Sequence, residues 1–147
     1  MKPTAFTIRV FCLLLHQGQI LLSRENIHGD LFTKFPGGGL EFGETMIDCI
    51  KREFMEEVGI TLSSIEHFYT TEGYFPSAFH NPPKQVLSIY YKVSTEELDK
   101  IKTEDPAKLF LLKENEDQIL YWCYLDNLKK QGIELPIDKI VVEKLLS

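Results

Sequence analysis

The middle of the chain carries three glutamates close together, Glu53, Glu56 and Glu57. On a helix, where each residue turns by about 100°, their carboxylates fall within an arc of about 100°. Like charges at these separations destabilise a helix, and partial burial strengthens the repulsion. Clustered carboxylates are hard oxygen ligands suited to Mg²⁺ or Mn²⁺, and Arg52 can neutralise one of them. The spacing therefore predicts a divalent metal site, with an ordinary exposed acidic helix as the competing interpretation.

A glycine-rich segment leads directly into these acids. Residues 36–43 contain one proline and four glycines, which argues against a helix interior and against a central strand. We expect a tight loop whose backbone can approach a ligand closely. Because the loop enters a helix N-terminus, where anions are favoured, a metal beside it would suit a diphosphate or triphosphate. Glu44 adds a fourth acid at the junction.

The residues from Gly38 to Ile60 resemble the Nudix box of the MutT-like Nudix hydrolase family. That box reads Gly, five residues, Glu, seven residues, then Arg-Glu-hydrophobic-any-Glu-Glu-any-Gly-hydrophobic. The matching positions are Gly38, Glu44, Arg52, Glu53, Phe54, Glu56, Glu57, Gly59 and Ile60. The resemblance implies an α/β fold, an α/β/α sandwich with a mixed β-sheet. It also implies Mg²⁺-dependent (or Mn²⁺-dependent) hydrolysis of a nucleoside diphosphate linked to another group.

The resemblance also assigns roles to the residues of the box. Glu53, Glu56 and Glu57 are expected to bind metal and form the base, while Arg52 orients a carboxylate and the carbonyl of Gly37 or Gly38 adds a ligand. Metal-bound water would attack the anhydride, and a carboxylate would take its proton. In the family this base can lie in a distant loop, where the candidates are Glu114, Glu116, Asp117 and Glu97.

Substrate contacts are expected from four residues outside the metal site. Arg24 closes a strand where relatives often place a phosphate contact, and Phe35 precedes the glycines. Tyr74 and Phe79 lie after the box, where aromatic side chains could stack on a base. Many relatives carry Trp at the position of Thr33, so a stacking role there does not transfer.

The elements that position these residues follow from periodicity and caps. Thr45 to Val58 is predicted as a helix with Thr45 as N-cap and Gly59 as its C-terminal stop. Its apolar stripe consists of Ile47, Ile50, Phe54 and Val58. The predicted strands are 4–15, one beginning at 20, 68–75, 86–93, 110–112 and 119–124, and residues 25–33 are predicted as a loop. A short helix or turn is expected at 125–130 and a second amphipathic helix at 136–146, with Pro136 at its start.

Length and composition narrow the class of protein. With 147 residues the chain is expected to form a single domain, 1–147, and its three cysteines to be buried and reduced. A net charge of −6 without a basic stripe argues against polymeric nucleic acid as a partner. No apolar run approaches membrane-spanning length and no leader pattern stands at the start, so we expect a cytoplasmic monomer or homodimer.

Three function classes are compatible with these features. The favoured one is a pyrophosphohydrolase acting on a nucleoside triphosphate or another small nucleotide, with an ADP-sugar or dinucleoside polyphosphate as the alternative substrate. The second is a Nudix domain that senses a nucleotide without cleaving it, although the acids of the box are intact. The third, a Ca²⁺-binding or scaffold domain, lacks the Asp-rich loop that it would need.

Overall fold

The computed structural model describes residues 2–27, 29–78, 80–111 and 118–147. The strands are β1 (Phe6–His16), β2 (Gln19–Ile27), β3 (Asp30–Lys34), β4 (Gly37–Gly39), β5 (Ser64–Thr70), β6 (Gln85–Ser94) and β7 (Gln118–Tyr124). The helices are α1 (Met46–Glu57), α2 (Pro136–Leu146) and the short 3-10 helices η1 (Leu98–Lys100), η2 (Pro106–Leu111) and η3 (Leu125–Lys130).

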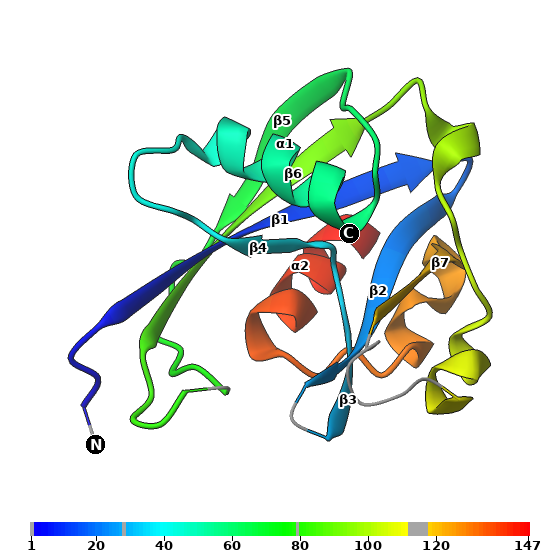
Figure 1. Ribbon diagram of the computed structural model, residues 1–147. Coiled ribbons are helices and arrows are strands. Elements are labelled where there is room, and N and C mark those ends of the chain that lie inside the picture. The colour runs from blue at the N-terminus through cyan, green and yellow to red at the C-terminus, as the bar shows by residue number, and fades with distance from the viewer. Residues whose placement is uncertain (1, 28, 79, 112–117) are drawn as a thin grey trace.

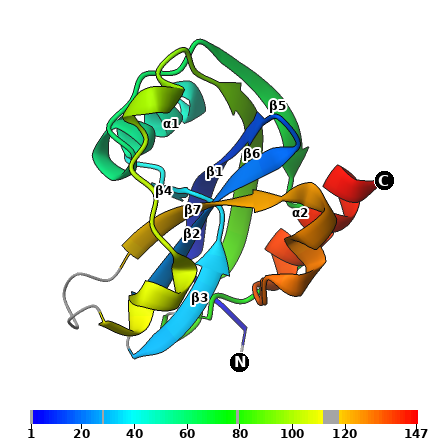
Figure 2. The same cartoon turned by 90° about the vertical axis from the view of Figure 1, so that its right-hand side faces the viewer.

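One mixed sheet organises the fold. Its main path runs β3-β2-β1-β6-β5, with β4 added to β1 and β7 added to β2. The β1–β6 pair is parallel, in register from Phe6 opposite Gln85 to Leu14 opposite Val93, and the other pairs are antiparallel. Helix α1 lies over one face of the sheet and α2 over the other (Figures 1 and 2). The predicted α/β/α sandwich with a mixed sheet is therefore confirmed.

Strand β1 separates two apolar cores because successive side chains point to opposite faces. Val10, Cys12 and Leu14 pack with α1 residues such as Phe54. Phe11 and Leu13 instead pack with α2 residues, among them Val141 and Val142. The three cysteines are buried and free, as predicted. Within the described residues, no helix has the length and apolar character needed to cross a membrane.

Both predicted α-helices form where expected. Thr45 caps α1, its Oγ1 accepting a hydrogen bond from the backbone N of Asp48 at 3.1 Å. The helix stops at Gly59, whose φ of +78° is left-handed. Helix α2 begins at Pro136 and ends at Leu146.

Four local predictions are wrong. Residues 25–33 are no loop, because β2 and β3 pair from Ser23 opposite Lys34 to Ile27 opposite Asp30, and the Asn and Gly only shape the turn. The strand predicted at 68–75 is β5, which begins at Ser64. The apolar residues near 110 belong to the 3-10 helix η2. Finally, the glycines 37–39 form strand β4 instead of a loop.

Candidate active site

Strand β4 brings its backbone unusually close to β1 and α1. A methyl group on Gly37 would lie 2.2 Å from the carbonyl oxygen of Val10, and one on Gly38 would lie 2.2 Å from Oε1 of Glu53. Real carbon–oxygen contacts are longer, so neither position can hold a side chain without movement. The close approach predicted from the glycines is therefore present, and it places the carboxylate of Glu53 directly against the backbone of β4.

Arg52 binds several acids around the start of α1. Its Nε and Nη2 donate to the two carboxylate oxygens of Glu44, at 3.1 and 2.7 Å. Its Nη1 donates to Glu53 at 2.9 Å, and Nη2 also donates to the carbonyl of Gly39 at 3.0 Å. Glu56 is 3.4 Å from Nη1, with a side chain that is 59% exposed. Arg52 thus contacts the carboxylates of Glu44, Glu53 and Glu56.

These contacts shift the pKa values of the partners. Hydrogen bonds from Arg52, helped by the backbone N of Glu41, lower the pKa of Glu44 to about 2. The same pairing raises the pKa of the Arg52 guanidinium further above its ordinary value. The pair therefore stays ionised throughout the neutral range.

Glu57 has a different environment. Its Oε2 accepts a hydrogen bond from the backbone N of Gly37 at 3.1 Å. Burial raises the pKa of this carboxyl to about 7, and the charges of Glu25 and Glu53 push in the same direction, while Lys34 opposes them. At neutral pH this carboxyl is therefore close to the midpoint of its titration. A cation beside it would lower its pKa and favour the carboxylate form.

The acids of the box provide the hard oxygen atoms that a divalent cation needs. Glu53 and Glu57 both lie against the glycine strand, whereas Glu56 stays at the solvent side of Arg52. Over the described ranges, no three His, Cys, Asp or Glu side chains are already arranged as a metal-binding group. The chemistry of the donor set fits Mg²⁺ or Mn²⁺, but the orientations seen here do not form a complete shell.

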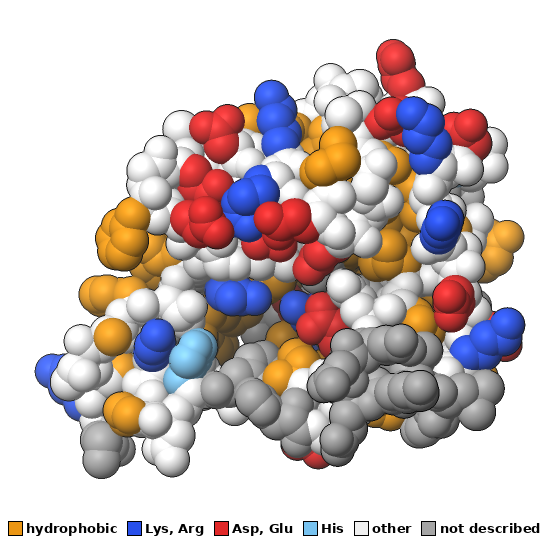
Figure 3. Space-filling model, viewed as in Figure 1, with side chains coloured by type: hydrophobic (Ala, Val, Ile, Leu, Met, Phe, Trp, Pro, Cys, Tyr) orange, Lys and Arg blue, Asp and Glu red, His pale blue; other side chains and the backbone are white. Residues whose placement is uncertain are grey.

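Figure 3 shows this acidic cluster over α1, and a hollow in the surface directly below it. The hollow is a cavity of about 410 Å³ on the α2 side of the sheet. Its lining residues are Thr7, Arg9, Phe11, Glu25, Ile27, Lys34, Phe75, Pro76, Ser77, Ala78, His80, Val86, Ser88, Tyr90, Leu135, Pro136, Ile137 and Asp138. The cavity thus combines an apolar wall with several charged side chains.

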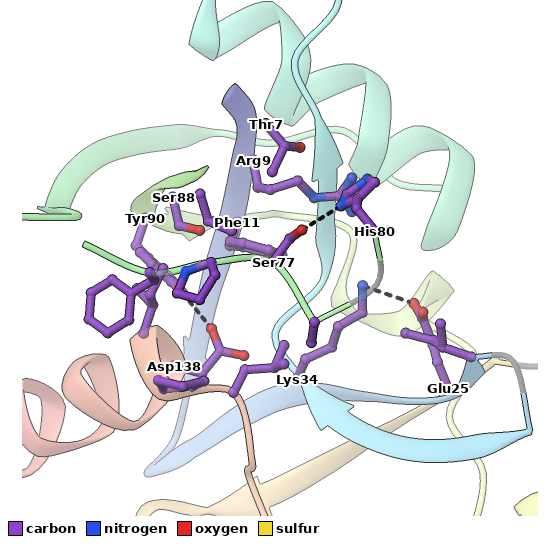
Figure 4. A pocket seen from close by; sticks show the side chains of 18 residues that line it. Thr7, Arg9, Phe11, Glu25, Lys34, Ser77, His80, Ser88, Tyr90 and Asp138 are labelled. Carbon is purple, nitrogen blue, oxygen red and sulfur yellow. Dashed lines mark hydrogen bonds and ion pairs between the residues drawn. The ribbon is translucent and has the colours of Figure 1, made fainter. Parts of the chain in front are cut away.

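Two polar pairs stand in the cavity wall (Figure 4). The Nζ of Lys34 lies 3.3 Å from Oε1 of Glu25, and only 8% of the Lys34 side chain is exposed. The hydroxyl of Tyr90 donates to Oδ1 of Asp138. The other oxygen of Asp138, Oδ2, is buried and has no hydrogen-bond partner among the described residues. Burial raises the pKa of Asp138 to about 6, although Tyr90 and Lys34 counteract the shift.

Sequence reasoning missed these cavity residues. Asp138 did leave a signal, since it occupies the apolar stripe of α2 three and four residues before the buried Val141 and Val142. Glu25 and Lys34 were hidden by the incorrect prediction of a loop at 25–33.

The residues predicted to contact the substrate are distributed differently. Arg24 donates through Nε to Thr33 Oγ1 at 3.2 Å and its guanidinium lies 5.7 Å from the centre of the Tyr121 ring. Phe35 is fully buried and packs edge-on against Tyr90, so it belongs to the core and is not a cavity contact. Tyr74 is 56% exposed and does not line the cavity, although its neighbour Phe75 does.

Most of the predicted candidates for the general base lie outside the described residues. Glu114, Glu116, Asp117 and the aromatic Phe79 lie outside the described residues. Glu97 accepts hydrogen bonds from the backbone N and Oγ1 of Thr61 and pairs with Lys100. These contacts lower the pKa of Glu97 to about 2. They occupy both carboxylate oxygens of Glu97, which does not line the cavity.

Comparisons with known proteins show the family of this chain. A family model described as the NUDIX domain matches residues 5–143. The NAD-capped RNA hydrolase NudC of Vibrio parahaemolyticus is 36% identical over 74 residues, covering 48% of this chain and 28% of that protein. The phosphatase NudJ of Escherichia coli K12 is 34% identical over 61 residues, covering 42% of this chain and 39% of that protein. The chain therefore spans well under half the length of these curated relatives.

Solved structures share the fold. A NUDIX hydrolase from Nitrosomonas europaea superposes with a TM-score of 0.69 at 19% identity, covering 97% of this chain and 87% of the other. The solution structure of the E. coli ORF135 protein gives a TM-score of 0.68, also at 19% identity, covering 97% and 89%. The family model spans nearly the whole sequence, and the box it contains builds the acidic cluster on β4 and α1. The chain belongs to the Nudix family.

Proposed function

We propose that this protein is a pyrophosphohydrolase that depends on Mg²⁺ or Mn²⁺ and cleaves a phosphoanhydride in a nucleoside diphosphate linked to another group. Its favoured substrate is a nucleoside triphosphate. The observation that carries the proposal is the position of Glu53 and Glu57 against the backbone of β4, beside a cavity large enough for a nucleoside. Nudix hydrolases generally use divalent metals and act on nucleotide-linked substrates, which supports the same conclusion.

The carboxylates of Glu53, Glu56 and Glu57 and the carbonyl of Gly38 would hold the metal. A bound ion would offset the negative charge of the diphosphate and lower the pKa of a water molecule, which makes it easier to convert that water into a nucleophile. Arg52 keeps Glu53 directed at this place by binding it together with Glu44. A carboxylate of the box then takes the proton of the attacking water, and the anhydride oxygen leaves with the departing phosphate.

The cavity supports a small nucleotide as substrate. Phe11, Phe75 and Tyr90 supply an aromatic wall beside the unpartnered oxygen of Asp138. That oxygen can accept a hydrogen bond from an N–H group of a ligand, and a nucleobase offers such a group on a flat apolar ring. Tyr74 remains a candidate for the rim, because its neighbour Phe75 lines the cavity, and Phe79 remains a candidate from the sequence alone. Arg24 and Phe35 already have structural partners.

The test is product analysis by chromatography with a panel of nucleoside triphosphates, nucleoside diphosphate sugars and dinucleoside polyphosphates. We expect hydrolysis with Mg²⁺ or Mn²⁺, none with EDTA, and a loss of at least about a hundredfold in kcat for Glu53→Gln and Glu57→Gln. Lys102→Gln, which changes an exposed residue remote from the cavity, serves as the control. Tight nucleotide binding without product would show a sensor domain, and inactivity toward the whole panel would refute the enzymatic proposal.

A further inference from the structure

Arg9 differs from the other charged residues of the cavity wall. Lys34 is paired with Glu25, and Asp138 is bound by Tyr90. Arg9 lines the same cavity and is partly buried, yet within the described parts of the chain it has neither a hydrogen-bond acceptor nor an ion-pair partner. The nitrogens of Arg9 are not among the buried unpartnered atoms, so they remain accessible, and the guanidinium provides five N–H donors for an anion.

The position of Arg9 relates it to the glycine strand. Arg9 stands opposite Gly39 in the β1–β4 pairing, and its Nη1 would lie 3.3 Å from a methyl group placed on Gly39. Glu53 packs on the neighbouring Gly38 and belongs to α1, which covers the other face of the sheet. One short strand is therefore flanked by the acidic cluster toward α1 and by a cation toward the cavity.

The surroundings of Arg9 suit an oxyanion (Figure 4). Arg9 lies near Ser77 and His80, which are joined by a hydrogen bond of 2.9 Å between Oγ and Nδ1. Burial lowers the pKa of His80, and the charges of Lys84 and Arg9 add to this effect. His80 is therefore neutral at pH 7 in the free protein, which leaves Arg9 as the positive charge of this group, and the imidazole can donate an N–H to an anion.

We propose that Arg9 forms an anion subsite for a phosphate group that is additional to the scissile diphosphate, and that it makes the enzyme select nucleoside triphosphates over nucleoside diphosphates linked to a neutral sugar. This inference rests on the proposed function. The scissile diphosphate would be neutralised by the metal on the acidic side of β4. A third phosphate would then find its counter-charge at Arg9, and a neutral sugar would leave the guanidinium unpaired.

Two measurements test the proposal with wild type, Arg9→Gln, Arg9→Lys and the control Lys102→Gln. The first compares kcat/KM for one nucleoside as its 5′-triphosphate and as its diphosphate-glucose. We expect Arg9→Gln to lower the value for the triphosphate by about tenfold or more and to leave the value for the sugar nucleotide nearly unchanged. Arg9→Lys should lower kcat/KM for the triphosphate less than Arg9→Gln does, because lysine keeps the positive charge but lacks the forked set of N–H donors. Equal losses for both substrates, or none, would overturn the subsite.

The second measurement needs no catalysis. Calorimetric titration of the metal-free protein in EDTA with inorganic tripolyphosphate should show binding that Arg9→Gln weakens about tenfold and Lys102→Gln leaves alone. Unchanged binding in Arg9→Gln would refute the anion subsite. Failure of every variant to hydrolyse any nucleotide would instead refute the proposed function and the substrate preference, while the titration still decides whether Arg9 binds anions. Melting curves confirm that each variant is folded.

Discussion

Arg52 reduces the electrostatic repulsion among the acids at α1. It binds Glu44 through two donors and Glu53 through a third, and it also donates to the backbone of Gly39. Glu56 also lies 3.4 Å from Nη1, so Arg52 reduces the repulsion expected between Glu53 and Glu56. Glu57 has no hydrogen bond or ion pair with Arg52 in the described part of the chain. Burial raises its pKa to about 7, although Lys34 and the N–H of Gly37 partly offset the shift. A cation beside Glu57 would favour its charged form further.

The two neighbouring glycines of β4 should respond differently to alanine. Gly38→Ala would push only the flexible end of Glu53, so we expect a loss of stability below about 1 kcal/mol and a fall in hydrolysis rate of at least about tenfold. Gly37→Ala would place its methyl group against the backbone of Val10 and Phe11, and should cost about 2–3 kcal/mol. Urea denaturation and nucleotide hydrolysis measure the two effects. A fully active Gly38→Ala protein would contradict the assigned role of Glu53.

At the scale of elements, α1 depends on local signals and on its buried stripe. Ile50, Phe54 and Val58 bury the apolar face, as predicted, and Thr45 and Gly59 define its ends. The helix must begin where it does, because Glu53 and Glu57 reach the glycine strand only in this register.

Thr45→Ala should therefore lower the free energy of unfolding by about 1 kcal/mol, since the N–H of Asp48 loses its acceptor. Chemical denaturation followed by circular dichroism measures this loss, with Thr4→Ala near the exposed N-terminus as the control. Thr45→Ser, which keeps the hydroxyl, should retain most of the stability. An unchanged midpoint for Thr45→Ala would show that packing alone fixes the start of α1.

On the scale of the whole molecule, the cavity joins elements that are distant in the sequence. Its walls come from β1, β2, β3, β6, residues 75–78 with His80, and the start of α2 (Figures 1 and 4). Asp138 reaches Tyr90 across 48 positions of sequence. A buried carboxyl with one unpartnered oxygen destabilises the free protein, and a ligand with a matching N–H would relieve that cost.

The pH dependence of stability should reveal this cost. Asp138 keeps its proton up to about pH 6 in the folded protein, whereas its ordinary pKa is 3.8. The folded state therefore binds this proton more tightly than the unfolded state does. The contribution of Asp138 to the free energy of unfolding is lost as the pH rises toward 6. Relative to Asp138→Asn, wild type should lose about 2 kcal/mol of unfolding free energy between pH 4 and pH 7, because the carboxyl of the unfolded chain is already partly ionised at pH 4.

Urea denaturation across that pH range measures the difference. Groups with lowered pKa values, such as Glu44 and Glu97, act in the opposite direction, but both proteins contain them and their effect cancels. The control Asp126→Asn, at an exposed position on η3, should show no such pH-dependent difference from wild type. A constant difference between wild type and Asp138→Asn at all pH values would contradict the raised pKa of Asp138.

Local interactions explain what could be predicted from the sequence alone. Helix caps and the 3.6-residue period depend on residues that are close in the sequence. The predicted ends of α1 and α2 therefore agree closely with the observed ends. The spacing of the box residues likewise determined which carboxylates share one helix face. The glycine strand and the β2–β3 hairpin were misread, because their pairing depends on partners elsewhere in the chain and on close backbone contacts that no local pattern records.

Only the tertiary structure decided what stands opposite the acidic cluster. Arg9, Lys34 and Asp138 are far apart in the sequence, and only the place of Asp138 in the apolar stripe of α2 marks one of them as unusual there. The sheet brings them to one cavity because β1, β3 and α2 meet on the face away from α1. The composition of the box thus determines the chemistry that the chain can perform, while long-range strand pairing determines which part of a substrate can lie beside it.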